Sequence, residues 1–517
     1  MKQRIRQLIP QALIEGYHYL WALTGALRYR WPSRELIVIG VTGTKGKTTL
    51  CALIHSLLQG HGIRTALSSS ESFRYGDEIE TNTSRVTMPG RWFLQRFLRE
   101  AVDRQCEVAI IEVTSEGLMQ HRHAGIDFDT TVFLNLHPEH IEHHGGYERY
   151  REAKGRLFQA LLRGLNKHLR GKLVRKTIVA NLDDREASYF LSFPAQQKIT
   201  FALSVTDRDA TTHLVPDKVQ LTARGASFSL GGAFFTTQVV GRQNLTNVLA
   251  ALATIRALDL PFASVRESLA TFVLPEGRFE IISARGFRIV VDYAHTPNSI
   301  EALYENIFEL LKPKRLVCVI GSTGGLRDKW KRPVIGEIAA RYCSEIIITN
   351  EDPFDEDPRT IMRSIERGVQ RYLEEYAFQK PHQVIEDRRE AIRYALSRAE
   401  PGDAVVLIGK GSERTIETAA GSISWHERTV VEEELAGLNR AQRAQASARE
   451  AATSMAALPV IPKGLRIEES AKLTTETKPN KSFTVSPPSV IKPRSYPKKT
   501  RPPTPKRQGS RRVKSKR

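Results

Sequence analysis

Residues 38–58 read VIGVTGTKGKTTLCALIHSLL and combine an apolar run, a glycine-rich turn and a run with helical spacing. Glycines let backbone N–H groups turn toward one anion, and the N-terminus of the following helix adds partial positive charge. We expect Lys47 to reach the β- and γ-phosphates of a nucleotide and the Thr48 hydroxyl to bind Mg²⁺. An ordinary glycine turn is the alternative, but the strand–loop–helix order favours a phosphate-binding loop. The predicted loop consists of Gly43, Thr44, Lys45, Gly46, Lys47, Thr48 and Thr49.

Two further segments place reactive groups beside this loop. Glu112 ends the apolar segment 107–113, and a carboxylate at the carboxyl end of a strand beside a phosphate loop is placed to hold Mg²⁺. His140 follows the apolar segment 130–136, and Lys154 falls on the next helical segment. A zinc site is the competing interpretation, but no cysteine or clear carboxylate partner completes it. That site would use His137, His140, His143 and His144.

Four strand-like segments beyond residue 280 each end in a loop suited to a ligand. Asp292 and His295 follow the first strand, where the alternative is a strand-terminating turn capped by Asn298. The second loop is glycine-rich and basic, which suits an anion, and the third is acidic, which suits an ammonium group. Because α/β domains bind ligands at strand ends, we expect these loops to line a ligand site. The loops lie at residues 290–303, 321–333, 350–358 and 409–414.

Alternating strands and helices must position these groups. The alternation over residues 36–165 predicts a parallel sheet, shorter strand-like pieces occupy 176–235, and a second α/β pattern begins near residue 280. We therefore predict an α/β protein with a P-loop ATPase domain that has a parallel-rich sheet, a C-terminal Rossmann-like domain and a disordered basic tail. The predicted parts are an N-terminal helical segment at 1–35, the two domains at 36–275 and 276–435, and a linker with the tail at 436–517.

The net charge of this 517-residue chain, +20, is concentrated at one end. Residues 461–517 hold 17 Lys and Arg against 3 Glu, which gives 17 − 3 = +14. This segment is rich in Pro, Ser and Thr and has few apolar residues, which is typical of a disordered tail. The rest of the chain is only mildly basic. The charge therefore indicates a weak tail contact with an anionic membrane or a nucleic acid, rather than a nucleic-acid-binding domain.

The four cysteines form no close pair in the sequence, which favours buried free thiols in the cytoplasm. They are Cys51, Cys106, Cys318 and Cys343.

The N-terminal segment LIEGYHYLWALTGALRYRW, residues 13–31, is apolar and aromatic between basic flanks. It is too short and too interrupted to span a bilayer, and it shows no small-residue cleavage site. We predict one or two helices packed on the first domain. A contact with a membrane surface is the alternative.

Taken together, the motifs resemble the Mur ligase family over residues 36–430. The phosphate loop is followed, in the family's order, by GRQNLTNVLAALA, EGRFE, DYAHTPNSIEAL, GEIAAR, EDP and GKGSE. The resemblance implies an ADP-forming amide ligase that uses ATP and Mg²⁺ and passes through an acyl phosphate. It also implies the substrates, an amino acid and a UDP-muramoyl dipeptide, whose D-glutamate receives a diamino acid in peptidoglycan synthesis.

The resemblance implies roles for individual residues. Lys154 matches the lysine that is carbamylated in this family, and a carbamate would act as a carboxylate-like ligand of a second Mg²⁺. The catalytic and metal-binding set is Lys47, Thr48, Glu112, His140 and Lys154. Near the nucleotide the matching residues are Asn244, Asn247, Arg278, Asp292 and His295. The substrate contacts are Thr83, Arg327, Asp352, Gly409 and Glu413.

The sequence also departs from the family. Family members usually carry an N-terminal domain that binds the uridine nucleotide, whereas 36 residues precede the first predicted strand here. The family's Arg-Asp-His is replaced by Pro-Glu-His at 138–140, and Ser412 replaces the histidine of GKGHE. Phe354 stands where diaminopimelate-type enzymes carry an arginine that makes a bidentate contact with a carboxylate. We therefore expect L-lysine or a similar diamino acid with one carboxylate, which Arg327 would bind.

Three other functions fit parts of the sequence. A folylpolyglutamate synthase-like ligase shares the fold and the acyl-phosphate chemistry, but GEIAAR, EDP and GKGSE favour the cell-wall branch. A P-loop ATPase that acts on nucleic acid would need basic and aromatic surfaces in the folded part, where none is evident. A non-catalytic partner of the same fold is disfavoured by the intact Lys47, Glu112, His140 and Lys154. We expect a cytoplasmic monomer.

Overall fold

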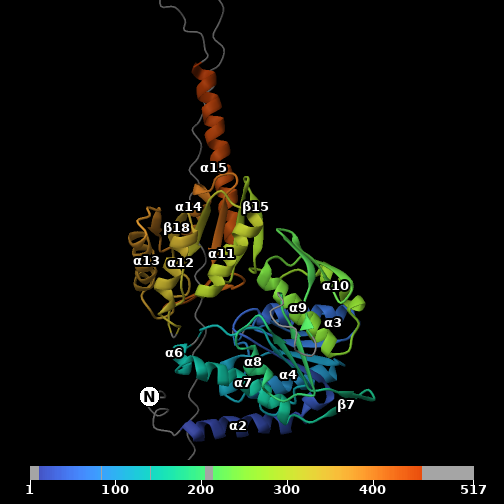
Figure 1. Cartoon of the computed structure of the whole chain (residues 1–517). Helices are drawn as coiled ribbons and strands as arrows, with labels where there is room; N and C mark the ends of the chain where they lie inside the picture. Colours follow the sequence, from blue (N-terminus) through green and yellow to red (C-terminus); the bar gives the residue numbers. More distant parts are fainter. Residues whose placement is uncertain are drawn as a thin grey trace, which may run out of the picture. The chain divides into compact units, whose positions relative to one another are not determined.

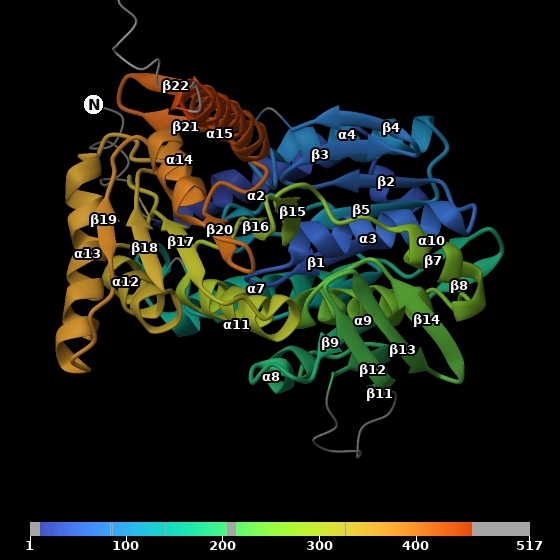
Figure 2. The ribbon, with the colours of Figure 1, turned by 90° about the horizontal axis from the view of Figure 1, so that it is seen from above.

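The computed structural model describes residues 11–82, 84, 86–139, 141–203, 213–325 and 327–456. The tail predicted beyond residue 456 lies outside them. Two large sheets, one before residue 275 and one after it, organise most of the described chain (Figures 1 and 2).

The first sheet has nine strands, and its neighbouring pairs are parallel except β2–β3 and β3–β4. In spatial order the strands are β11 (His213–Leu214), β10 (Gln197–Phe201), β9 (Thr177–Asn181), β6 (Thr130–Phe133), β1 (Ile37–Thr42), β5 (Val108–Glu112), β2 (Thr65–Ser68), β3 (Ser72–Tyr75) and β4 (Glu78–Thr81).

Alternate side chains of β1 enter two separate cores, because successive residues of a strand point to opposite faces. Ile39 and Val41 pack with the helices on one face, and Val38 packs with those on the other. The first face carries α3 (Lys47–Gly60), η2 (Phe262–Val265), α9 (Arg242–Ala257) and α10 (Arg266–Thr271). The second carries α4 (Arg91–Asp103), α5 (Ser115–Met119), α7 (Tyr147–Arg163) and α8 (Ala187–Leu191).

Smaller elements surround this sheet. A three-stranded antiparallel sheet adds Phe228 and Phe235 to the core beneath α9. The remaining elements are α2 (Gln11–Arg28), η1 (Pro32–Glu35), α6 (Ile141–His144), β7 (Lys167–Leu169), β8 (Lys172–Val174), β12 (Asp217–Thr222), β13 (Gly225–Leu230) and β14 (Ala233–Thr237).

The second sheet has six strands, of which only the edge strand β15 is antiparallel to its neighbour. Its order is β15 (Glu280–Ala284), β16 (Phe287–Asp292), β20 (Ala404–Ile408), β17 (Leu316–Ile320), β18 (Glu345–Ile348) and β19 (His382–Val384). One face carries α11 (Pro297–Leu311), α12 (Lys331–Tyr342) and α13 (Pro358–Glu375). The other carries α14 (Arg388–Arg398) and α15 (Glu427–Ala456), and a hairpin of β21 (Thr415–Thr418) and β22 (Gly421–Ser424) precedes α15.

The prediction of four free thiols is wrong for one pair. Cys318 lies in β17, Cys343 directly follows α12, and the two form a disulfide with their Cα atoms 6.1 Å apart. Strands β17 and β18 pair side by side, so two residues 25 positions apart in the sequence meet in space. Cys51 and Cys106 are buried and free, as predicted.

The two ends of the described chain are helical. The predicted N-terminal helix is confirmed as α2, which packs on α4 through the stacked rings of Trp21 and Trp92, 5.6 Å apart. At the other end, residues 436–456 continue α15 instead of forming the predicted linker. This stretch is rich in Ala, Arg, Gln and Glu, which favour helix.

Among the described residues, no helix has both the length and the apolar character to cross a membrane.

Candidate active site

The turn between β1 and α3 has the form of a phosphate-binding loop. Gly46 has φ 82°, and a Cβ at this position would lie 2.6 Å from Asn247 Oδ1, so only glycine fits without strain. Asn135 holds the loop, because its Oδ1 accepts from the backbone N–H groups of Thr44 and Lys45 at 3.0 and 2.8 Å. Lys47 Nζ donates to the carbonyls of Gly43 and Thr44, both at 3.0 Å, and so lies directly over the loop.

Three oxygen-bearing side chains meet at the start of α3. Thr48 Oγ1 lies 3.1 Å from each carboxylate oxygen of Glu112. Ser70 Oγ lies 3.0 Å from Glu112 Oε2 and 2.9 Å from Thr48 Oγ1. Thr48 and Glu112 are buried. Hydroxyl and carboxylate oxygens are hard ligands, so this donor set fits Mg²⁺. The sequence interpretation missed Ser70, although it follows β2, the strand beside β5.

The zinc alternative finds no support in the part of the chain that the structure describes. No group of three or more His, Cys, Asp or Glu residues there is arranged to hold a metal. His144 Nε2 instead bonds Ser115 Oγ at 3.1 Å. His140, a predicted metal ligand, and the sugar-peptide residue Thr83 lie outside the described residues.

Lys154 is buried against the same loop. Its Nζ donates to the Gly43 carbonyl at 2.8 Å and lies 4.8 Å from the centre of the Tyr150 ring. Burial, together with the positive charge of Lys47, lowers the pKa of Lys154 well below its usual value. Loss of the proton is therefore easier for this amine than for a solvent-exposed lysine, and the amine lies against the phosphate loop.

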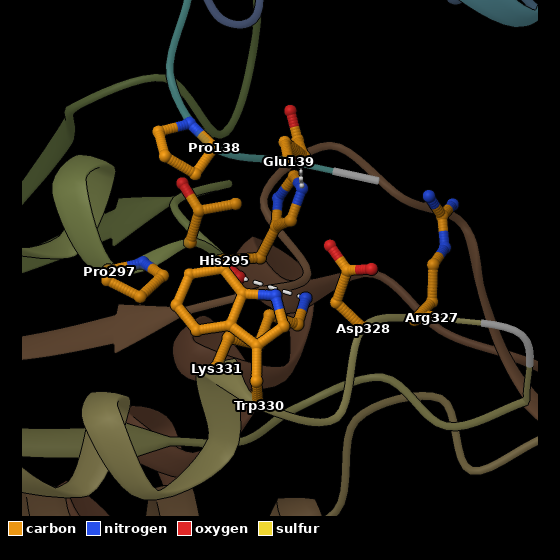
Figure 3. Close-up of a pocket in the computed structure, with 9 residues that line it drawn as sticks. Pro138, Glu139, His295, Pro297, Arg327, Asp328, Trp330 and Lys331 are labelled. Carbon is orange, nitrogen blue, oxygen red and sulfur yellow. Dashed lines mark hydrogen bonds and ion pairs between the residues drawn. The ribbon is translucent and has the colours of Figure 1, made fainter. Parts of the chain in front are cut away.

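A polar contact joins the phosphate loop to the second domain, and Figure 3 shows two of its residues, Glu139 and His295, next to each other. Lys45 Nζ donates to Glu139 Oε1 at 2.8 Å and lies 3.0 Å from His295 Nε2. His295 Nδ1 lies 2.8 Å from the Tyr293 carbonyl and donates to it, which leaves Nε2 as the acceptor for Lys45. Burial lowers the pKa of His295 to about 3 and that of Lys45 to about 8. Glu139, which replaces the family's aspartate, thus helps to hold the two domains together.

An open cleft lies between the phosphate loop and the second domain. Four of the five residues predicted to lie near the nucleotide line it, whereas His295 lines a separate pocket. Asn247 packs on Gly46 and donates to Asn244 Oδ1 at 3.4 Å. The Arg278 guanidinium lies 4.5 Å from the centre of the Tyr293 ring, and its buried Nε has no partner among the described residues. The lining includes Lys45, Gly46, Thr49, Asn244, Asn247, Arg278 and Asp292.

The Asp292 side chain is bonded to the backbone in the wall of this cleft and does not project into the cleft. Its two carboxylate oxygens accept from the backbone N–H groups of Phe279 and Ala294, both at 2.7 Å. Burial nevertheless raises the pKa of Asp292. The neighbouring turn at Gly277 has φ 66°, and a Cβ there would overlap the backbone of Gly411 and Ser412. The backbones of the motifs EGRFE and GKGSE are therefore in direct contact at Gly277 and at Gly411 and Ser412.

Lys410, in the loop at 409–414, neutralises Asp352 of the acidic loop at 350–358. Lys410 Nζ donates to both carboxylate oxygens of Asp352, at 2.8 and 2.9 Å, and to Glu413. The backbone N–H of Glu417 also donates to Asp352, at 2.8 Å. Burial acts against the charge of Lys410, but Glu413 and Asp352 outweigh it and raise the pKa of the lysine. Asp352 and Glu413 are thus already paired, which leaves them less free for a substrate than the sequence suggested.

Glu351 is the carboxylate that the sequence interpretation passed over. Its Oε1 accepts from Thr323 Oγ1 at 2.7 Å, whereas its buried Oε2 has no partner within the described residues. Gly409 makes room for it, because a Cβ at 409 would overlap the Glu351 carboxylate. Glu351 is one residue before Asp352 in the EDP motif. Both are buried, and the two differ in their partners, which the sequence does not reveal.

The remaining predicted substrate residues lie nearer the surface. Arg327 is exposed and lines a second pocket, with Glu139, His295, Trp330 and Lys331 (Figure 3). Phe354 is 40% exposed and has φ 53°, and its backbone N–H donates to the Glu417 carbonyl at 3.0 Å.

Comparisons with known proteins agree with this architecture. Residues 41–255 match the Mur ligase middle domain, and residues 277–411 match the Mur ligase, glutamate ligase domain. A UDP-N-acetylmuramoyl-L-alanyl-D-glutamate--2,6-diaminopimelate ligase of Geobacillus kaustophilus is 34% identical over 410 residues, which cover 78% of this chain and 80% of the relative.

Solved structures give the same picture. One ligase of that name is 28% identical, with a TM-score of 0.53 over 78% of this chain and 79% of its own. A folylpolyglutamate synthase of Mycobacterium tuberculosis, 16% identical, has a TM-score of 0.58 over 75% of this chain and 92% of its own, a likeness of fold alone.

The fold and the site define an ATP-dependent ligase that forms amide bonds and releases ADP. The chain belongs to the Mur ligase family. This membership confirms the predicted fold class and the predicted type of reaction, and it gives no support to a P-loop ATPase that acts on nucleic acid.

Proposed function

We propose that this protein adds a diamino acid to a UDP-N-acetylmuramoyl dipeptide in peptidoglycan synthesis. The observation that carries the proposal is the set of groups on and beside the phosphate loop. Lys47 and Lys154 both donate to the Gly43 carbonyl, the Thr48 and Glu112 oxygens meet at the start of α3, and Lys45, Gly46 and Thr49 line the cleft. A carboxylate is a poor electrophile, and phosphorylation by ATP converts it into an acyl phosphate that an amine can attack.

The residues of the chain account for the charge that develops in this transfer. Lys47 would neutralise the transferring phosphoryl group, and its Nζ is held by the Gly43 and Thr44 carbonyls, which accept from it. Thr48, Ser70 and Glu112 would hold Mg²⁺, which neutralises phosphate charge when bound. Arg278 and the Asn244–Asn247 pair line the cleft where the nucleoside would lie. Contact between the two domains excludes water from a labile acyl phosphate.

We further propose that Lys154 is carbamylated. An unprotonated amine can react with CO₂, and the burial that lowers the pKa of Lys154 favours that form. The N–C bond forms between Nζ and the carbon of CO₂, and a proton leaves the nitrogen. The product is a carboxylate-like group beside Thr48 and Glu112, where it could bind a second Mg²⁺.

For the amino acid, we propose a diamino acid that has one carboxylate, such as L-lysine. Glu351 Oε2 is buried without a partner among the described residues and would pair with a substrate ammonium if the surrounding loops open, and the exposed Arg327 would bind the α-carboxylate. Phe354 offers no donor for a second carboxylate. Two of the proteins compared above are named as diaminopimelate ligases, and their names do not support a preference for lysine. The proposed preference rests on the residues of this chain.

The decisive experiment measures phosphate release by the purified protein with ATP, UDP-muramoyl dipeptide and a panel of amino acids. We expect release only when dipeptide and diamino acid are both present. Release that requires folate and glutamate instead would overturn the proposal.

Lys154→Ala tests the carbamate in the same assay. We expect a loss of activity of at least about 10²-fold, because a metal ligand is removed, and partial recovery with formate or acetate. The exposed Lys218→Ala is the matched control. Near-normal turnover of Lys154→Ala would exclude the carbamate role.

A further inference from the structure

The outward side of α2 is apolar. Leu13, Leu20 and Leu27 are each 64% exposed, and Tyr17 is 60% exposed. Their spacing places them along one face of the helix, which we call the α2 stripe: Leu13, Tyr17, Leu20 and Leu27. Figure 1 shows α2 at the outer edge of the first domain, with α4 and α7 on one side of it. A surface helix ordinarily turns charged or polar residues outward, so this stripe lacks the partner that its composition requires.

The opposite side of α2 is already used. Ala22 and Ala26 are buried against the domain, and Trp92 Nε1 donates to the Trp21 carbonyl at 3.2 Å. The 18 residues of α2 include only two charged side chains, Glu15 and Arg28. The helix is therefore anchored to the domain on one side and apolar on the other.

Basic groups lie at one end of the stripe. Both Arg28 and Arg30 are exposed where α2 ends. Along its flank, the Tyr19 ring packs on His121, with ring centres 5.8 Å apart.

Next to His121 lies a group of arginines that face one another. Arg91 Nη2 and Arg122 Nε are buried without a partner among the described residues, and so is Arg156 Nη1. Arg91 Nε and Arg122 Nη2 both donate to Gln120, at 3.0 and 2.8 Å, which holds the two guanidinium groups close together.

The environment of these two arginines is unfavourable for further positive charge. Burial lowers the pKa of both Arg91 and Arg122, and the positive charge of Arg122 adds to the effect on Arg91. Glu15 and Glu116 are the acids near this group. Such clustered donors favour an anionic neighbour.

We propose that α2 binds an anionic phospholipid surface, with the α2 stripe in the headgroup region and the exposed Arg28 and Arg30 at the lipid phosphates. This contact does not rest on the ligase assignment. An interfacial helix combines an apolar face with basic residues, and α2 does not have the character of a membrane-crossing helix. A second copy of the chain seated on the stripe would bring the two sets of arginines together, which repulsion opposes. The +14 charge of residues 461–517 supplies a second attraction to the same surface.

The test is flotation of the full chain with vesicles of phosphatidylcholine, with or without phosphatidylglycerol. The variant Leu20→Glu/Leu27→Glu removes the centre of the stripe. The control Val273→Glu/Ile423→Glu changes two residues that are 69% and 55% exposed elsewhere. We expect the unchanged chain and the control to bind anionic vesicles, and the stripe variant to bind about tenfold more weakly or less. Phosphate release should be unaffected in all three, because neither pair belongs to the active site.

Two further measurements distinguish the stripe from the basic tail and from a contact between two copies of the chain. High salt screens the tail, so the difference between stripe variant and control should persist at high salt while overall binding falls. Arg28→Glu/Arg30→Glu should weaken binding to vesicles that contain phosphatidylglycerol and not alter phosphate release. Equal flotation of the stripe variant and the control would overturn the proposal. So would a dimer in sedimentation velocity that the stripe variant abolishes, without any binding to vesicles.

Discussion

The phosphate loop and the acidic loop at residues 350–358 both carry the charges that their sequences predict, but they use them differently. In the phosphate loop, Lys47 contacts only two backbone carbonyls among the described residues and remains a net positive charge. In the second domain, Lys410 is fully buried between Asp352 and Glu413. One loop keeps its charge for a ligand, and the other uses its charges to hold the domain together.

The difference shows that a charged motif has to be read together with its internal partners. A lysine that contacts only backbone carbonyls loses little interaction free energy when a phosphate replaces those carbonyls. A lysine paired with two carboxylates is a structural group, because separating a buried pair leaves an uncompensated charge. Residues of the same type, close to the same cleft, therefore have opposite expected effects on activity and stability.

Lys47→Ala should have the largest effect on activity. We expect phosphate release to fall by at least about 10³-fold, because the transferring phosphoryl group loses its main cationic partner. The thermal midpoint should change little, since Lys47 has no buried acidic partner among the described residues. Circular dichroism and phosphate release measure the two outcomes, with Lys218→Ala as the control. A folded variant that still releases phosphate normally would remove the loop from its assigned role.

Asp352→Asn should show the reverse pattern. It removes one of the carboxylates that compensate the buried Lys410, and we expect the free energy of unfolding to fall by about 3 kcal/mol. The exposed Asp355→Asn, in the same loop, is the matched control and should be close to neutral. Urea denaturation measures both. If the two variants were equally stable, Asp352 would be free for a substrate and the contrast between the loops would fail.

A pH series tests the helix that follows the phosphate loop. His55 in α3 is buried, its Nδ1 bonds Thr65 Oγ1 at 2.7 Å, and burial lowers its pKa to about 4. The unfolded chain, with a histidine pKa near 6.5, binds more protons between these values, so stability falls as the pH drops through that window. Between pH 7 and pH 5 this loss is on the order of 2 kcal/mol.

The measurement is the urea midpoint at pH 7 and pH 5 for the unchanged chain and for His55→Gln. We expect a smaller drop in the variant, which has no proton to gain at this position. His123 and His295 contribute in the same direction, because burial lowers the pKa of each to about 3. An identical drop in both proteins would show that His55 does not titrate in this range.

The smallest effect concerns the choice of amino acid. Phe354→Arg should raise kcat/KM for meso-diaminopimelate relative to L-lysine by about tenfold, or 1.4 kcal/mol, because it adds a bidentate donor for a second carboxylate. Phe378→Arg, at another exposed phenylalanine, is the control. A preference of the unchanged protein for diaminopimelate of tenfold or more would show that another residue binds the distal carboxylate.

The sequence predicted the fold and the phosphate loop well, because both depend on local patterns. Apolar runs such as EVAIIEV and the glycine spacing at 43–46 are short-range signals, and the structure has the corresponding strand and turn. It failed where partners are distant in the sequence. The Cys318–Cys343 disulfide depends on strand order, and the pairing of Asp352 with Lys410 joins residues 58 positions apart. Ser70 and Glu351 were missed because only burial and neighbours distinguish them from ordinary polar residues.

The turn at Gly277 has a consequence for how this protein can vary. The backbone of residues 276–278 lies directly on that of Gly411 and Ser412, with no space for a side chain between them. A side chain at residue 277 would require the other segment to move, so we expect a change in one stretch to be tolerated only together with a matching change in the other. Anyone who recombines halves of related sequences to make chimeric enzymes should take both segments from the same parent.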